Sequence, residues 1–237
     1  FPAAGAAVNK LLSLYRLGEA REVIDEANGL LNRHADFSSN GEAYWRLLEL
    51  PLGLCCLELN KPDLAIEHLL GAKDCIDSAG LLHMHGQIEL SLFKAYYAMG
   101  DKQGAAAVAA QTREQMGRMH YPYSDLLIRM FRLLSSNAGE DDIRADLEWL
   151  DLAAQTGKGD RLLMTELLAY LKIHRLADGI TVEQLLDSLE HLRYTGYIPQ
   201  LQLFLILTAE LYFMNRKLVN ASSCLKEAVK LKKQYGL

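Results

Sequence analysis

Small and large apolar residues recur along the chain with the spacing of one helix face. In "LGEAREVIDEA", Ala20, Ile24 and Ala27 stand at positions i, i+4 and i+7, which places them on one side of an α-helix. Five later segments share this spacing: Ala65, Leu69 and Ala72; Ala105, Ala109 and Thr112; Ala145, Trp149 and Leu152; Leu185, Leu189 and Leu192; and Ala221, Leu225 and Ala228. Counted from Ala20 to Ala221, successive sets start 45, 40, 40, 40 and 36 residues apart. Such a period predicts stacked helical hairpins.

A second helical segment, rich in Leu and aromatic residues, precedes these sets, as in "AYWRLLELPLGLCCLEL", "IELSLFKAYYAM", "SDLLIRMFRLL", "RLLMTELLAYLKIHRL" and "LQLFLILTAELYFM". Turn signals separate the two helices of each pair: "RLGE", "LNKPD", "MGDKQG", "NAGEDD", "LADGIT" and "MNRK". Thr181 and Gln184 fit a capping box. Pro51 predicts a kink, or two shorter helices that meet. The pattern as a whole predicts an all-α fold of six hairpins, about twelve helices, stacked in a right-handed superhelical solenoid.

"LPLGLCCLELNKPDLAIEHLLGA" and "FKAYYAMGDKQGAAAVAAQ" resemble tetratricopeptide (TPR) repeats. The matching features are the Leu52-Gly53 pair, the aromatic Tyr96, the turn residue Gly100 and the small–large–small set of the second helix. The longer period of this chain is similar to that of the superhelical sensor domain of MalT-type bacterial transcription regulators of the LuxR family. The resemblance implies one TPR-like α-α superhelix over residues 1–237, as a fragment of a longer protein.

Composition and charge narrow the functional classes. A formal net charge of −5 and a pI near 5.8 argue against direct nucleic-acid binding, and the lysines 226, 230, 232 and 233 are favoured by the dipole at the end of the last helix. The longest apolar run, 201–213, is too short and too polar to span a membrane, and the chain starts without a signal peptide. The four cysteines have no metal-site spacing and are expected to be buried, reduced residues. We therefore expect a cytoplasmic protein.

No motif predicts catalysis, a metal site or a cofactor. "QTGKGD" lacks the first Gly and the final Ser or Thr of a P-loop. The histidines of "HMHG" point apart on a helix and lack a third ligand. Tyr170 and His174 share a helix face and could contact a ligand, with core or surface placement as the alternative. We therefore expect a protein that is not an enzyme.

The remaining functional prediction is a binding surface. Polar residues interrupt the apolar first helices, and because burying an unpaired charge is costly, we expect them to line the concave groove of the solenoid: Arg46, Glu49, Glu89, Lys94, Arg129, Arg132, Tyr170, His174 and Glu210. Polar residues of the second helices should face outward: Glu22, Asp25, Lys73 and Lys226.

We expect this groove to bind a protein or peptide, such as a flanking domain of the same chain, in a signalling or transcription-regulatory protein. Lys94, Arg129 and Arg132 would favour an acidic partner segment. The alternative is a domain that senses a small effector, as in a MalT-type ATP-dependent activator. The modules that flank this segment in the full-length protein would distinguish the two functions.

Overall fold

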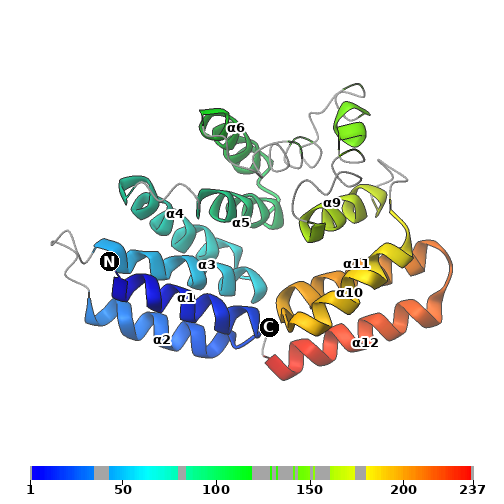
Figure 1. Ribbon diagram of the computed structural model, residues 1–237, viewed down its shortest axis with the longest axis horizontal. Coiled ribbons are helices and arrows are strands. Elements are labelled where there is room, and N and C mark those ends of the chain that lie inside the picture. The colour runs from blue at the N-terminus through cyan, green and yellow to red at the C-terminus, as the bar shows by residue number, and fades with distance from the viewer. Residues whose placement is uncertain are drawn as a thin grey trace. The chain divides into compact units, whose positions relative to one another are not determined.

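The structure is a computed structural model that describes residues 2–34, 43–79, 84–118, 129, 132, 141, 144–149, 152, 161–173 and 180–235. Over these residues every regular element is a helix (Figure 1), so the predicted all-α class is confirmed for them. The chain divides into two compact units: unit 1 comprises residues 1–114 and the last three residues, and unit 2 comprises residues 115–234. One continuous superhelical domain over residues 1–237 stays a prediction.

Unit 1 is built from helices that pack mainly on their neighbours in sequence. Its elements are α1 (Pro2–Arg16), α2 (Ala20–Arg33), the 3₁₀ helix η1 (Ala43–Leu48), α3 (Glu49–Glu58), α4 (Pro62–Ala79), α5 (His85–Ala98) and α6 (Lys102–Arg118), whose end passes the boundary at residue 114. Helix α1 packs against α2, η1 and α3, while α4 packs against η1 and α3 and also against α5. Fully buried large side chains form the core, among them Leu11, Leu48, Leu69, Ile76, Leu92 and Phe93.

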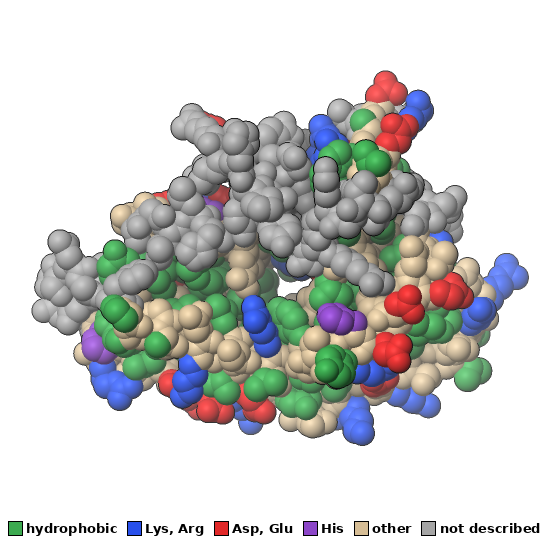
Figure 2. All heavy atoms as spheres, viewed as in Figure 1, with side chains coloured by type: hydrophobic (Ala, Val, Ile, Leu, Met, Phe, Trp, Pro, Cys, Tyr) green, Lys and Arg blue, Asp and Glu red, His purple; other side chains and the backbone are tan. Residues whose placement is uncertain are grey.

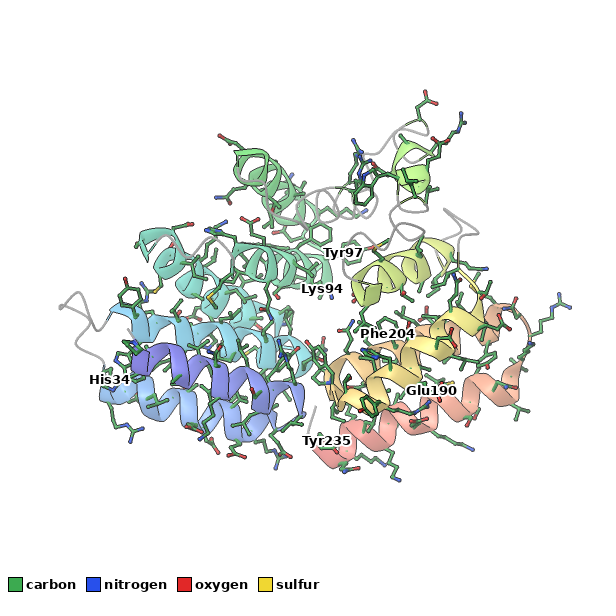
Figure 3. All side chains as sticks on the ribbon, viewed as in Figure 1. His34, Lys94, Tyr97, Glu190, Phe204 and Tyr235 are labelled. Carbon is green, nitrogen blue, oxygen red and sulfur yellow. The ribbon has the colours of Figure 1, made fainter. Side chains whose placement is uncertain are left out.

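Unit 2 contains four described helices: α9 (Arg161–Ile173), α10 (Val182–Thr195), α11 (Ile198–Met214) and α12 (Leu218–Tyr235). Helices α9, α10 and α11 pack against one another, and Leu185, Leu192 and Phe204 are fully buried among them (Figure 3). The predicted capping box begins α10: Thr181 Oγ1 accepts from the Gln184 amide, and Gln184 Oε1 accepts from the Thr181 amide. The geometry of this predicted helix start is therefore confirmed.

One turn geometry joins the helices of four hairpins: α1–α2, α3–α4, α5–α6 and α11–α12. Each turn holds one residue with positive φ, namely Gly18, Asn60, Gly100 and Arg216, at φ 84°, 55°, 73° and 58°. Its amide donates to the carbonyl three residues back at 2.9–3.0 Å, and the next amide donates to the carbonyl five residues before it at 2.8–3.0 Å. This is the Schellman motif, which satisfies carbonyls at a helix end. These four turns coincide with predicted turn signals.

The shared turn provides a second way to align the repeats, independent of the pattern of small and large apolar residues. Ala65, Ala105 and Ala221 each follow the positive-φ residue by five positions, and in the first hairpin that position is Val23. The predicted alignment on Ala20 is therefore offset by three residues. It was consistent with the pattern because Ala20 and Val23 lie on one helix face and are both fully buried.

Burial confirms some of the predicted contact positions and corrects others. Ala65, Leu69 and Ala72, and likewise Leu185, Leu189 and Leu192, are almost fully buried. The fourth set is wrong, because Ala145 is exposed and its neighbour Asp146 is buried instead. Leu152 and Leu225, predicted as interior residues, are also largely exposed.

Pro51 marks the meeting of two shorter helices, one of the two predicted outcomes. Helix η1 ends at Leu48 and α3 begins at Glu49, so Pro51 lies in the first turn of α3. A missing amide hydrogen costs least there, because the first amides of a helix have no intrahelical acceptor. Two residues on, Gly53 lets Leu69 of α4 approach closely: a Cβ at Gly53 would lie 2.6 Å from Leu69 Cγ.

Candidate functional site

Arg46 and Glu49, two of the predicted groove residues, pair with each other. The Arg46 Nε atom lies 3.4 Å from Glu49 Oε1. Glu49 is half-buried against α4, where a Cβ on Gly71 would lie 1.6 Å from Glu49 Oε2. Burial raises the pKa of the Glu49 carboxyl, and the positive charge of Arg46 partly opposes this shift. The pair therefore contributes to the packing of η1 and α3 against α4.

Glu89 corrects the groove prediction, because its side chain is fully buried rather than solvent-facing. Its Oε1 atom lies 3.0 Å from Nζ of Lys73, which is also buried. Lys73 was expected to face outward from the second helix, and that expectation is wrong for the same reason. One turn from this pair on each helix, His85 Nε2 lies 3.1 Å from Asp77 Oδ1. The Lys73–Glu89 ion pair and the His85–Asp77 contact therefore connect α4 to α5.

Arg129 and Arg132 also bind within the fold. Asp146, whose side chain is fully buried, accepts from Arg129 Nη1 at 2.5 Å and from Arg132 Nε at 2.6 Å. The Arg129 guanidinium lies 4.6 Å from the centre of the Trp149 ring, a cation–π distance. The two arginines were expected to present positive charge to an acidic partner. Both guanidinium groups instead bind Asp146, the residue that is buried in place of Ala145.

The other predicted groove residues are scattered between the two units. Lys94 lies on α5, one turn from Tyr97 (Figure 3), and is partly buried with contacts inside the fold. Glu210 is exposed on α11. The Tyr170 side chain and His174 lie outside the described residues. The structure thus brings Arg46 to Glu49 and Arg129 to Arg132, and it places Lys94 and Glu210 in separate units.

Sequence reasoning missed an exposed apolar surface on the last hairpin, which we call the α11–α12 face and define by Phe213, Leu218, Leu225 and Val229. These residues line one shallow groove together with Ala221, Ser222 and Lys226. The four side chains are 67%, 60%, 46% and 50% exposed, respectively. Leu218, Leu225 and Val229 follow one another at i, i+7 and i+11, a single stripe on α12. That spacing is readable in the sequence, and the stripe runs beside the buried residues Ala221 and Ala228 of α12.

Basic side chains border this surface. Lys226 lines the groove, and Lys230 and Lys233 follow it at i+4 and i+7 on the exposed side of α12. Figure 2 shows exposed hydrophobic side chains (green) and Lys and Arg side chains (blue) on one face of the molecule. Glu227 is directed elsewhere, because Arg193 of α10 donates to both of its carboxylate oxygens at 2.8 and 3.0 Å. The α11–α12 face therefore combines apolar residues with a positively charged flank.

The cysteines are free, and three of them are buried, as expected. Burial raises the pKa of the Cys55 thiol to about 12, with the neighbouring Cys56 and Glu58 adding to the shift. Burial also raises the pKa values of Cys56, Cys75 and Cys224. Because the thiolate is the nucleophilic form, none of these residues is activated for covalent chemistry at neutral pH.

Among the described residues, no group of three or more His, Cys, Asp or Glu side chains is arranged to hold a metal ion. None of the helices in the described part of the chain combines the length and apolar character needed to cross a membrane. No protein-family model matches the sequence, and no curated protein or solved structure shows significant similarity to the chain.

Proposed function

We propose that the chain is a non-catalytic protein–protein interaction module, of the TPR-like superhelical type, in a bacterial signalling or transcription-regulatory protein. The observation that supports this most is the α11–α12 face, where four large apolar side chains remain about half exposed or more. Monomeric soluble proteins rarely expose a large contiguous apolar patch. A contiguous apolar surface with a polar rim instead favours binding of another polypeptide.

The repeated hairpin geometry supports the same function. Four hairpins share one turn, and the helices of unit 1 pack mainly on their sequence neighbours. Folds of this kind offer extended helix faces, and they bind partners along them without rearranging a central core. In the proposal, the partner is a segment of another protein or a flanking domain of the same chain.

A selection experiment tests the function without assuming the partner. The immobilised 237-residue chain is challenged with a displayed library of protein fragments, and enriched fragments are titrated by calorimetry. We expect fragments with dissociation constants of roughly micromolar or tighter, about −8 kcal/mol. Failure to recover any specific polypeptide would contradict the proposal. A metabolite that raises Tm while no polypeptide binds would support effector sensing instead.

The predicted concave groove is best tested at a residue that has no structural role in the fold. Reversing Arg129 and Arg132 to Glu would place carboxylates beside the buried Asp146 and destabilise the fold. Glu210 is exposed, unlike the other predicted groove residues whose side chains the structure describes, so the informative variant is Glu210→Lys, with Glu22→Lys and Asp25→Lys on the exposed side of α2 as controls. If first helices carry the binding surface, only Glu210→Lys should change the affinity of selected fragments. Equal effects of all three variants would contradict the groove.

A further inference from the structure

We propose that the α11–α12 face binds an amphipathic helix with an acidic flank. This inference rests on the proposed function and narrows it to one surface and one class of partner. A helix-in-groove complex places apolar residues spaced i, i+3 or i+4, and i+7 into a groove between helices. The groove on this face lies between Phe213 of α11 and the stripe of Leu218, Leu225 and Val229 on α12.

The internal repeat shows what covers this position elsewhere in the chain. Val229 follows the positive-φ residue Arg216 by thirteen positions, and in the second hairpin Lys73 follows Asn60 by the same number. Lys73 Nζ lies 3.0 Å from Glu89 Oε1 of α5. The side of the second helix that carries Val229 in α12 is therefore, in α4, the side that the next helix covers. A helix is thus the occupant that this face fits.

Charge complementarity sets the polar flank of that helix. Lys226, Lys230 and Lys233 lie along one side of the stripe, and Glu227 is the single acidic residue of the sequence between positions 216 and 235. Glu227 is already bound by Arg193. In the covered hairpin, the incoming helix likewise brings an acidic residue, Glu89, to a lysine of α4. Glutamates placed beside the apolar residues of the partner would complete ion pairs with the lysines of α12.

A second copy of this chain is a poorer occupant. In a two-fold interface with antiparallel α12 helices, the lysine flanks of both copies would lie on the same side, because an isologous interface repeats one patch on both sides. Like charges brought together in this way oppose association. An acidic helix removes this repulsion and buries the same apolar area.

The test uses two designed peptides of about five helical turns, with Leu at i, i+4, i+7 and i+11. One carries Glu beside the leucines, and the other carries Lys at the same positions. Fluorescence anisotropy with the full 237-residue chain should show binding of the Glu peptide and much weaker binding of the Lys peptide. Salt should weaken the complex with the Glu peptide.

Two variants and two matched controls locate the surface. Leu225→Gln with Val229→Gln should weaken the Glu peptide about tenfold or more, because anchor residues at the centre of an interface carry most of its energy. Lys226→Glu with Lys230→Glu should weaken it several-fold and improve binding of the Lys peptide. The controls replace other exposed residues: Leu186→Gln with Tyr194→Gln, and Lys61→Glu with Lys102→Glu. Far-UV circular dichroism checks that each variant folds.

Several results would overturn the inference. These are equal affinity for both peptides, no binding of the Glu peptide, equal loss from variants and controls, self-association abolished by the Leu225/Val229 variant, or preferential binding of phosphatidylserine vesicles. If library fragments bind the chain and the Leu225/Val229 variant leaves their affinity unchanged, the interaction function stands and this inference fails. If no polypeptide binds at all, the proposed function fails as well.

Discussion

Helices α4 and α12 begin after the same turn, yet one is covered and the other is exposed. Leu69 and Leu225 both lie nine residues after the positive-φ residue, and their exposed fractions are 0% and 46%. Lys73 and Val229 also share a position, at 7% and 50% exposed. The charged residue is thus on the buried helix and the apolar one on the exposed helix, the reverse of the usual preference. Burial therefore depends on whether another helix packs over a position, and not on the polarity of its residue alone.

The largest expected effect concerns the buried ion pair of α4. Lys73→Met should lower the free energy of unfolding by about 3–5 kcal/mol, because it leaves the Glu89 carboxylate buried without its counter-charge. Urea unfolding followed by circular dichroism measures this. Adding Glu89→Leu should recover most of the loss, and Val229→Lys at the same position of α12 should change stability by no more than about 0.5 kcal/mol. Similar costs for Lys73→Met and Val229→Lys would break the comparison.

The next largest effect is the difference in stability cost between truncating Leu69 and truncating Leu225, which share a repeat position. Leu69→Ala should cost roughly 2–5 kcal/mol, since it leaves a cavity against Gly53 in the core of unit 1. Leu225→Ala removes a side chain that is about half exposed, so we expect a cost below about 1 kcal/mol. The measurement is the urea midpoint at constant m-value. A loss from Leu225→Ala as large as that from Leu69→Ala would mean that α12 is covered in solution.

The shared turns predict a smaller effect of opposite sign in two hairpins. Gly100→Ala should destabilise by about 1 kcal/mol, because φ at that position is 73°. Arg216→Gly should stabilise by roughly 0.5–1 kcal/mol, since it removes the same steric strain at φ 58°. Thermal unfolding of both variants checks the pair. A destabilising Arg216→Gly would show that the arginine side chain contributes more than its backbone strain costs.

The smallest effect is the pH dependence contributed by Glu49. Burial raises the pKa of this carboxyl above its ordinary value of 4.5, so the folded state holds the proton more tightly than the unfolded state. Its contribution to stability is complete below 4.5 and is lost as the pH rises through the higher folded value. Glu49→Gln does not titrate, so its stability relative to the parent chain should increase between about pH 4 and pH 7. A difference that is constant or decreasing over this range would contradict the assignment.

Much of the fold could be predicted because helix periodicity and turn residues are local properties. Gly18, Asn60 and Gly100 stand where a left-handed residue ends a helix, and Thr181 with Gln184 marks a helix start that the structure confirms. The sequence could not decide whether the repeat of the first hairpin should be aligned on Ala20 or on Val23, because residues three positions apart lie on the same helix face. The prediction that Ala145 is buried is wrong because the buried position is the neighbouring one, Asp146. The carboxylate of Asp146 forms an ion pair there instead of an apolar contact.

The candidate site was less predictable, because it depends on which side chains meet across helices. Polar interruptions of the first helices indicated a groove, yet Glu89 and Arg132 satisfy their charges with partners 16 and 14 residues away. Sequence spacing within one helix carries no information on such pairs. The α11–α12 face was missed because the sequence does not show whether another helix covers an apolar stripe. The stripe of Leu218, Leu225 and Val229 looks like any core stripe until the structure shows it exposed.

The recurring turn also bears on how quickly the chain folds. Each turn closes hydrogen bonds between residues three and five positions apart, and the helices it joins are consecutive in sequence. Such contacts need little loop closure, and chains rich in local contacts fold in microseconds to milliseconds. Because each of these four hairpins carries its own turn, nucleation can begin at any of them and propagate to the next. Each hairpin can therefore gain structure during synthesis before the helix that will cover it has been made.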